Sequence, residues 1–264
     1  MTIGLISGTG LYEFDLLKQA ENKMIATPYG EAVLYLSEYQ GQKLAFLPRH
    51  GKEHGVLPHQ INYRANIYAL ASVGCKEILS LCCVGSMSEK MPPGSLVLLE
   101  QFIDQTWGRE MTFSTEGAVD HVDVTDPYCA YLNEHLQAAA KAVKIPILSG
   151  GVYLCAQGPR FETAAEIKAY AMWGANLVGM TGVPEAQLAK EAGLCYASLA
   201  VVANYAAGFA SEEAIDAQEI SQIVSKQREV LQKLLITMLS PELKSVKTCN
   251  CDKAKIANCR QWGF

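Results

Sequence analysis

The segment from Gln157 to Gly208 has the highest density of residues that can hold a polar ligand. It contains three motifs, QGPRFET, VGMTGVPE and VANYAAG, and each combines an apolar run typical of a β-strand with one or two polar residues at its end. In an open α/β sheet, the ends of the strands deliver such side chains to a common crevice where ligands bind. The segment therefore predicts a site for a small polar ligand at one edge of a sheet.

Two motifs nearer the N-terminus have the chemistry of an anion site. Residues 7–10 read SGTG after a predicted strand, and a glycine-rich turn leaves backbone N–H groups able to face an anion, with Thr9 adding a hydroxyl donor. The turn lacks the third glycine of a dinucleotide fingerprint and the Gly-Lys-Ser/Thr of a P-loop. Arg49 and His50 end another predicted strand, where Arg can hold an oxyanion bidentately and His can donate a further hydrogen bond. The simpler alternatives are a plain tight turn at residues 7–10 and a surface ion pair at Arg49.

Composition excludes several classes of partner. The chain has 264 residues and a formal net charge of −5, without a run of basic residues, so the electrostatic signature of a protein that binds nucleic acid or an anionic membrane is missing. The N-terminus has no basic region followed by a long apolar stretch, and no later segment approaches about 18 uninterrupted apolar residues. We expect a cytoplasmic protein that binds neither nucleic acid nor membrane.

Strand-like and helix-like segments alternate along the chain, and this pattern predicts an α/β fold with a central mixed β-sheet flanked by helices. No linker-like stretch divides the segments, so we expect one domain over residues 1–240 and a loose, cysteine-containing tail over residues 241–264. The expected strands are TIGLIS, EAVLYLSEY, KLAFLPRH, EILSLCCV, SLVLLEQFI, YLCAQ, NLVGM and CYASLAVVAN, and the expected helices cover residues 61–72, 127–143, 163–173, 184–192 and 211–238, the last with Ser211 as its N-cap.

The nine cysteines fall into two groups. Those in apolar segments are expected to be buried free thiols. In the polar tail, Cys249 and Cys251 form a C-x-C motif, with Cys259 eight residues further on, but no His lies nearby and no fourth ligand is evident. We expect exposed free thiols and no metal in the tail. The two alternatives are a disulfide and a metal site. The first group comprises Cys75, Cys82, Cys83, Cys129, Cys155 and Cys195.

A family resemblance covers residues 3 to 240. The segments SGTG, PRHGKEH, PHQINYRANIYAL, VGS, QFIDQTWGREMTF, QGPRFETAAE, VGMTGVPEAQLAKEAGLCYASL and ANYAAG resemble, in order and spacing, the trimeric purine nucleoside phosphorylase and methylthioadenosine phosphorylase family. The resemblance implies an α/β pentosyltransferase that cleaves an N-glycosidic bond with phosphate and releases a purine and a ribose 1-phosphate. It also implies a homotrimer, with a dimer of trimers as an alternative, and no cofactor, because inorganic phosphate is a co-substrate.

The same resemblance assigns roles to individual positions. Asn204, Glu162 and His50 would be the catalytic residues. Where relatives have a hydroxyl or amide, this chain has Leu81-Cys82-Cys83, so a contact from Cys83 must come from the backbone. The phosphate site would comprise Thr9, Arg49, His50, the backbone at Cys83, and Thr181, whereas Met180, Phe161, Glu162, Asn204, Ala206, Ala217 and, from a neighbouring subunit, His121 would contact the nucleoside.

Two positions of the predicted site bear on the base. In the methylthioadenosine branch the VANYAAG stretch resembles Thr-Asp-Tyr-Asp, whose acids suit a 6-amino purine, but this chain has Asn204 and Ala206 instead. An Asn side chain can accept a hydrogen bond from the protonated N7 of the leaving base through its C=O and donate one to a 6-oxo group through its NH2. Glu162 can accept the N1 proton of a 6-oxopurine, whereas adenine has no proton at N1. Both positions therefore favour hypoxanthine or guanine over adenine.

The 5′ end of the sugar is a separate question. Ala217 aligns with a His that meets the 5′-hydroxyl in the inosine and guanosine branch, and an apolar residue suits a methylthio group better. VGMTGVPEA and the AAG after Asn204 resemble the S-methyl-5′-thioinosine phosphorylases, so methylthioinosine is the favoured substrate. The alternatives are an inosine or guanosine phosphorylase, a methylthioadenosine phosphorylase, a nucleosidase that uses water, and a non-catalytic purine-binding protein.

Overall fold

Strand β5 is the centre of the fold. In this computed structural model, β5 (Cys75–Ser86) pairs in parallel with both β1 (Thr2–Ser7) and β9 (Cys195–Tyr205), and its last two residues pair antiparallel with β8 (Leu177–Gly179). The structure describes residues 2–8, 14–51, 53, 55–210, 217–243 and 246–264, without the side chains of residues 217–221 and 241.

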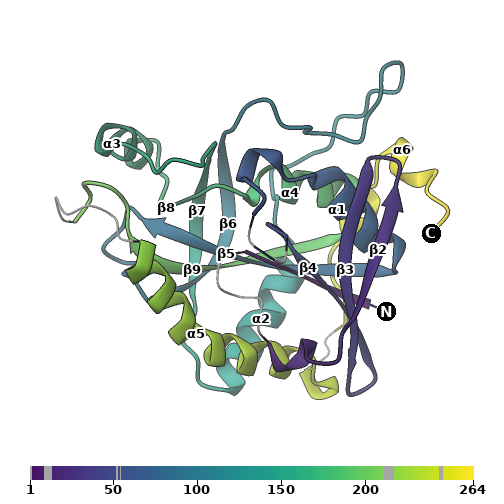
Figure 1. Cartoon of the computed structure of the whole chain (residues 1–264), viewed down its shortest axis with the longest axis horizontal. Helices are drawn as coiled ribbons and strands as arrows, with labels where there is room; N and C mark the ends of the chain where they lie inside the picture. The colour runs from purple at the N-terminus through teal and green to yellow at the C-terminus, as the bar shows by residue number, and fades with distance from the viewer. Residues whose placement is uncertain (1, 9–13, 52, 54, 211–216, 244–245) are drawn as a thin grey trace.

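The described strands form one mixed sheet with two parts. Strands β5, β8, β7, β6 and β9 pair in that order and close on themselves through the pairing of β9 with β5, while β1, β4, β3 and β2 extend from β5 as an open wing. Figure 1 shows the wing beside the closed part. The remaining strands are β2 (Glu21–Thr27), β3 (Gly30–Tyr39), β4 (Gln42–Pro48), β6 (Leu96–Gln105) and β7 (Leu148–Ala156).

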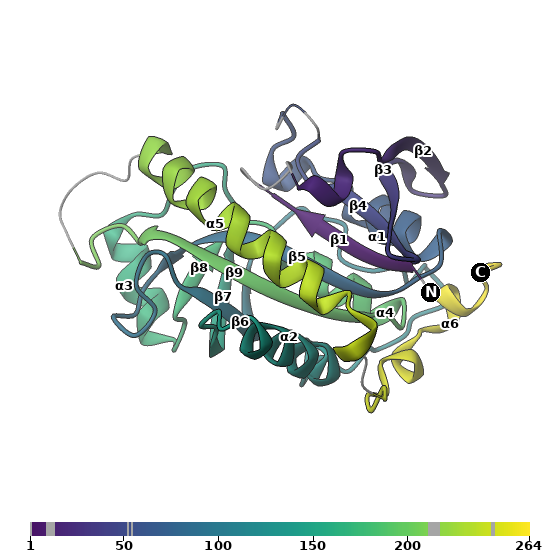
Figure 2. The ribbon, with the colours of Figure 1, turned by 90° about the horizontal axis from the view of Figure 1, so that it is seen from below.

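Helices cover both faces of the sheet. Helices α2 and α5 lie together across one face, over β9, as Figure 2 shows, and α1 and α4 pack on the opposite face. The alternation of β1 explains the two cores, because Ile3 and Leu5 are buried in one hydrophobic cluster and Ile6 in the other. The described helices of more than eight residues are α1 (Tyr63–Ser72), α2 (Ala130–Ala142), α3 (Ala164–Met172), α4 (Gly182–Glu191) and α5 (Ala217–Met238).

The structure confirms the α/β class and contains each of the expected strands and helices, although β7 begins at Leu148, before the expected YLCAQ, and the described part of the last helix begins at Ala217. The expected N-cap of the last helix, Ser211, lies outside the described residues. Strand β2 was not predicted, because ENKMIAT is polar and is mostly exposed at the edge of the sheet. In the part of the chain that the structure describes, no helix has the length and apolar character needed to span a membrane.

The C-terminal segment differs from the loose tail expected from the sequence. Its short elements are η3 (Pro241–Leu243), η4 (Cys251–Ala254) and α6 (Ala257–Arg260). Cys259 is completely buried, the N–H of Ile256 donates to the carbonyl of Glu191 at 3.0 Å, and the Trp262 ring packs edge-on against Phe113. Burial of these apolar side chains holds the tail on the domain, where Figure 1 shows it next to α1.

Candidate active site

One cavity of about 370 Å³ brings most of the predicted site residues together. It lies where β1, β4, β5 and β9 end, at the edge of the sheet to which parallel strands point their carboxyl termini. The turn from β8 to α4 and the loop after β7 complete its wall. Of the predicted residues, those that line the cavity are Arg49, His50, Cys83, Phe161, Glu162, Met180, Thr181, Asn204 and Ala206.

At one end of the cavity, Arg49 is paired with a carboxylate within the protein. Its Nε and Nη2 atoms donate to the two carboxylate oxygens of Glu185 at 2.7 and 2.9 Å, and both side chains are only 1% exposed. Burial lowers the pKa of Arg49, but the adjoining Glu185 carboxylate outweighs this and raises it, so the guanidinium stays charged. The prediction that Arg49 holds an external oxyanion bidentately is therefore wrong, because Nε and Nη2 of Arg49 already donate to Glu185.

The Glu185 carboxylate is fixed from several sides. Its Oε1 atom also accepts hydrogen bonds from the Tyr196 hydroxyl at 2.7 Å and from the Ser80 hydroxyl at 3.0 Å. Arg49 Nη1 donates to the carbonyl of Leu81 at 3.3 Å. This Nη1 atom lies 3.0 Å from the place where a Cβ on Gly8 would be, so the glycine of the SGTG turn leaves room for the guanidinium. A second N–H of Nη1 is the part of Arg49 that can reach a ligand.

His50 and Thr181 add polar groups at the same end. The Nδ1 atom of His50 lies 2.8 Å from the carbonyl oxygen of Val56, and because a carbonyl only accepts, Nδ1 carries the proton. Thr181 precedes α4 and lines the cavity, and its hydroxyl makes no capping bond, so this hydroxyl can donate to a ligand. These groups make this end of the cavity suitable for an anion.

The turn from β8 to α4 is shaped by a buried tyrosine. The backbone N–H groups of Thr181 and Gly182 donate to the Tyr153 hydroxyl at 3.1 and 3.2 Å. A Cβ on Gly179 or Gly182 would lie 2.8 or 2.7 Å from the ring of Tyr153. The glycines of VGMTG therefore let the ring approach the backbone and hold Met180 and Thr181 against the cavity.

At the other end of the cavity lies a carboxylate with one unpaired oxygen. Glu162 is 8% exposed, and among the described residues its Oε1 atom has no hydrogen-bond partner. Burial raises the pKa of this carboxyl group above its ordinary value. Asn204 lines the same cavity and donates through Nδ2 to the carbonyl of Tyr205 at 2.6 Å, and Ala206 is 3% exposed beside it. A buried acceptor without a partner is costly unless a ligand supplies the donor.

The loop that carries Glu162 is held by its neighbours. Arg160 donates to both carboxylate oxygens of Glu166 at 2.8 and 2.7 Å, and Glu166 completes a capping box with Thr163 at the start of α3. The Arg160 guanidinium and the Thr163 N–H lower the pKa of Glu166 to about 2. The motif GPRFET therefore fixes a turn that directs Glu162 into the cavity and leaves Phe161 at its mouth, 47% exposed.

Three predicted residues are not placed in the cavity. Thr9 lies outside the described residues, and Ala217 is the first residue of α5, with a side chain that is not described. His121 is exposed and does not line the cavity of its own chain. Burial raises the pKa of the Cys83 thiol to about 12, so the thiol is protonated at neutral pH and is a poor nucleophile.

Sequence reasoning assigned no role to Glu185, Ser80 or Tyr153, although each shapes the site. Glu185 could have been found, because it is an isolated acid inside the otherwise apolar stretch VGMTGVPEA. A charged residue in such a stretch is buried with a partner of opposite charge. Tyr153 gave no such signal, because YLCAQ reads as an ordinary buried strand.

Residues 2–240 match the family model of the Phosphorylase superfamily. The chain is 43% identical over 256 residues to a probable 6-oxopurine nucleoside phosphorylase of Dictyoglomus turgidum, covering 96% of both chains. It is 41% identical to a 6-oxopurine nucleoside phosphorylase of Pyrococcus furiosus over 96% of this chain and 97% of that one. It is 39% identical to an S-methyl-5′-thioadenosine phosphorylase of Thermofilum pendens, again over 96% of both.

Solved structures resemble the whole chain. The methylthioadenosine phosphorylase of Schistosoma mansoni in complex with adenine superimposes with a TM-score of 0.89 at 31% identity, covering 96% of both chains. A methylthioadenosine phosphorylase from an antarctic soil metagenomic library has a TM-score of 0.86 at 35% identity, covering 98% of this chain and 96% of that one. In sequence, relatives named 6-oxopurine nucleoside phosphorylase and relatives named S-methyl-5′-thioadenosine phosphorylase are about equally similar to this chain.

Proposed function

The chain belongs to the Phosphorylase superfamily, and we propose that it is a purine nucleoside phosphorylase specific for 6-oxopurine nucleosides, with S-methyl-5′-thioinosine as the preferred substrate. The products would be hypoxanthine and 5-methylthioribose 1-phosphate. Identity to relatives does not separate the two bases, because a 6-oxopurine phosphorylase and a methylthioadenosine phosphorylase match at 41% and 39%. The proposed preference for 6-oxopurines therefore rests on Glu162, Asn204 and Ala206, which line the cavity.

The unpaired Oε1 atom of Glu162 is the observation that carries the proposal. A carboxylate in the cavity needs a donor, and the N1–H group of hypoxanthine or guanine supplies one. Adenine presents a lone pair at N1, which would face the carboxylate and leave both acceptors unsatisfied. A site that is built to hydrogen-bond one group rejects the analogue without it by roughly 10⁴-fold in favourable cases, so a single carboxylate is sufficient to select the base.

Asn204 and Ala206 support the same choice. The Asn204 Oδ1 atom can accept a hydrogen bond from N7–H once the leaving base is protonated there, and the Asn204 Nδ2 atom can donate to a 6-oxo group. In the structure the amide donates to the carbonyl of Tyr205, so contact with the base requires this bond to be exchanged or shared. The methyl group of Ala206 is neutral and offers no acceptor for a 6-amino group.

The anion end of the cavity fits a phosphate that attacks in line. Thr181, His50 and the second N–H of Arg49 Nη1 would hold the phosphate, with the backbone at Cys83 and with Thr9. The bond between C1′ and N9 breaks, a positive charge develops on the ribosyl group, and the fixed phosphate stabilises this charge before its oxygen bonds to C1′. The protein itself supplies no covalent nucleophile in this scheme.

The proposal of a 5′-methylthio group rests on Ala217, which takes the place of a His that meets the 5′-hydroxyl in the inosine and guanosine branch of the family. His121 would reach the site of a neighbouring subunit, and its exposure outside the cavity of its own chain fits this role. We therefore propose a homotrimer in which each 5′ pocket is completed across an interface. A dimer of trimers is the alternative assembly.

The test measures release of free base from methylthioinosine, inosine, guanosine, methylthioadenosine and adenosine, each with and without inorganic phosphate. We expect strict dependence on phosphate and a preference for the three 6-oxopurine nucleosides, with methylthioinosine first. A preference for adenine nucleosides would refute the role of Glu162. Turnover without phosphate would identify a hydrolase, and absence of turnover on all five would refute the proposed activity and favour the non-catalytic alternative.

A further inference from the structure

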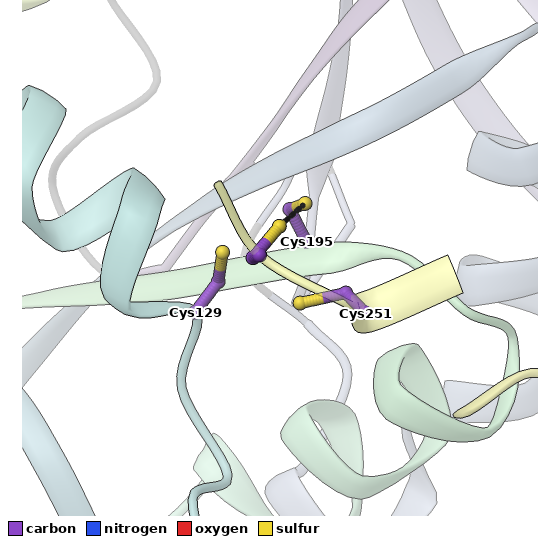
Figure 3. A group of neighbouring side chains, drawn as sticks. Cys129, Cys195 and Cys251 are labelled. Carbon is purple, nitrogen blue, oxygen red and sulfur yellow. Dashed lines mark hydrogen bonds between the residues drawn. The ribbon is translucent and has the colours of Figure 1, made fainter. Parts of the chain in front are cut away.

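Four cysteines from three separate parts of the chain meet outside the cavity. Their Sγ atoms all lie within 4.8 Å of one another, and the Cys195 and Cys249 sulfurs are 3.4 Å apart. Figure 3 shows the Cys129, Cys195 and Cys251 side chains pointing toward a common centre. None of the four lines the cavity, so they are separate from the proposed catalytic site. The sequence alone had offered only Cys249, Cys251 and Cys259, and the structure replaces Cys259 with two thiols from the domain.

We propose that Cys129, Cys195, Cys249 and Cys251 form a tetrathiolate site for one Zn²⁺ ion that fastens the C-terminal segment to the domain. Zinc bound to four thiolates has Zn–S bonds of about 2.3 Å in a tetrahedron, and this places neighbouring sulfurs about 3.8 Å apart. The Cys195–Cys249 distance of 3.4 Å lies just below that value, and the upper bound of 4.8 Å on all the pairs lies above it. The four sulfurs thus have the number and spacing of a closed structural site.

The arrangement also fits a metal better than a set of disulfides. In a disulfide, two sulfurs are bonded at about 2.05 Å and belong to each other alone. Here each of the four sulfurs is near the other three, and all nine cysteines of the chain are free thiols. Several of the others, such as Cys75 and Cys155, are fully buried in the core, as is common in proteins that function in reducing compartments.

The domain holds half of the site in advance. Cys129 is the N-cap of α2, and its N–H donates to the carbonyl of Tyr196 at 2.8 Å, so the start of α2 is tied to the start of β9 next to Cys195. The tail supplies the C-x-C pair, with Cys251 at the first position of η4. Metal binding would therefore join α2, β9 and the tail at one point and release the protons of the four thiols.

Two lysines offset the charge of such a site. Zinc with four thiolates has a net charge of −2, which is costly to bury without nearby positive groups. Lys247 lies beside the Cys195 and Cys249 sulfurs. Lys190 lies on the side of Cys251 and is anchored by donating to the carbonyl of Asp126 at 2.7 Å.

The experiment uses the full chain, purified under reducing conditions and exposed to zinc before removal of free metal. We expect about one zinc per chain by elemental analysis, and, after exchange with Co²⁺, the intense visible bands of a tetrahedral cobalt thiolate. Titration of accessible thiols should show four more reactive groups after chelation than before it. Chelation should also lower Tm by about 5 °C or more.

Variants locate the site. Cys251→Ser should reduce bound zinc to less than about a fifth of the wild-type amount, and Cys75→Ser, a buried cysteine outside the cluster, should bind as much zinc as the wild type. If Cys251→Ser does not fold, metal content, cobalt bands and thiol titration of the wild type decide alone. A reduced wild-type chain that binds no zinc, cobalt bands without thiolate ligation, or disulfides among these cysteines that persist under reducing conditions would overturn the proposal.

Discussion

The two ends of the cavity differ in how far their charges are satisfied before any ligand arrives. At the anion end, Arg49 is held by Glu185 at 2.7 and 2.9 Å, and Ser80 and Tyr196 complete the partners of that carboxylate. At the base end, Glu162 is buried with an oxygen that has no partner among the described residues. At the anion end the buried charges are paired within the protein, whereas at the base end one buried acceptor oxygen lacks a donor.

This difference separates rigidity from selectivity. A fully paired buried network fixes geometry, and it presents only the remaining donors to a ligand, such as the second N–H of Arg49 Nη1. An unpaired buried acceptor instead selects a ligand, because any ligand without the matching donor leaves the acceptor unsatisfied. We therefore expect changes at the anion end to affect folding first, and changes at the base end to affect the choice of substrate.

Breaking the network at the anion end should have the largest effect. Glu185→Gln removes the charge that compensates Arg49 in a site that is 1% exposed, and loss of one partner of such a pair costs about 3–5 kcal/mol. Urea denaturation measures the free energy of unfolding. Inorganic phosphate should restore part of the loss, because a bound anion supplies the missing negative charge.

The matched control for this change is Asp15→Asn. Asp15 forms an ion pair with Lys18 at 2.6 Å, but the two side chains are 60% and 75% exposed, so solvent screens the pair. We expect no measurable change in the free energy of unfolding for this variant. A loss in Glu185→Gln as small as in the control would show that the buried pair does not organise the anion end.

The base end is tested by Glu162→Gln. A hydrogen bond to a charged acceptor contributes about 1.5–3 kcal/mol, so kcat/KM for 6-oxopurine nucleosides should fall by about 10²-fold, while that for 6-amino nucleosides should change much less. Glu134→Gln, on the exposed side of α2, is the control and should leave both values unchanged. An equal fall in kcat/KM for both classes of nucleoside would mean that Glu162 does not distinguish the two bases. The free energy of unfolding should stay near the wild-type value, in contrast to Glu185→Gln.

Asn204→Asp sharpens the comparison within the base end. An acid at this position can accept from a 6-amino group, so the ratio of kcat/KM for methylthioadenosine to that for methylthioinosine should rise by about tenfold or more. Steady-state assays with both nucleosides measure this ratio. Asn204→Ala is the control and should lower both values without changing their order. An unchanged ratio in Asn204→Asp would contradict the assignment of Asn204 to the base.

The fold could be predicted because its strands carry strong local signals. TIGLIS and CYASLAVVAN are apolar runs of a sheet that is buried on both faces, and the structure places both at the centre of the sheet. Strand β2 could not be predicted, since an exposed edge strand does not need an apolar pattern. The packing of the tail depends on contacts such as that of Trp262 with Phe113, which are distant in the sequence.

The site was predictable where each residue follows a recognisable strand end or turn. Glu162 and Asn204 are in this group, and the structure brings them into one cavity. The pairing of Arg49 with Glu185 was missed because 136 residues separate them, and no periodicity links the two. The four-cysteine cluster was missed for the same reason, because Cys129 and Cys195 read as ordinary apolar positions until the fold places them beside the tail.

The smallest effect that we predict is a dependence of base selectivity on pH. Burial raises the pKa of Glu162, so the carboxylate gains a proton at a higher pH than an exposed glutamate does. Above this pKa the carboxylate would accept from the N1–H group of a 6-oxopurine, as the proposed function requires. Below it the protonated group donates instead, which suits the N1 lone pair of adenine. Selectivity for 6-oxopurine over 6-amino nucleosides should therefore fall by a few-fold as pH decreases.

The ratio of the two kcat/KM values is the right measurement for this effect, because protonation of phosphate alters the rate with both nucleosides and cancels in the ratio. Glu162→Gln has no group to titrate at this position, so its ratio should be the same at every pH. If the wild-type ratio is also constant down to the pH at which the protein unfolds, then Glu162 either stays ionised or does not contact N1. In that case the selectivity would have to come from Asn204 alone.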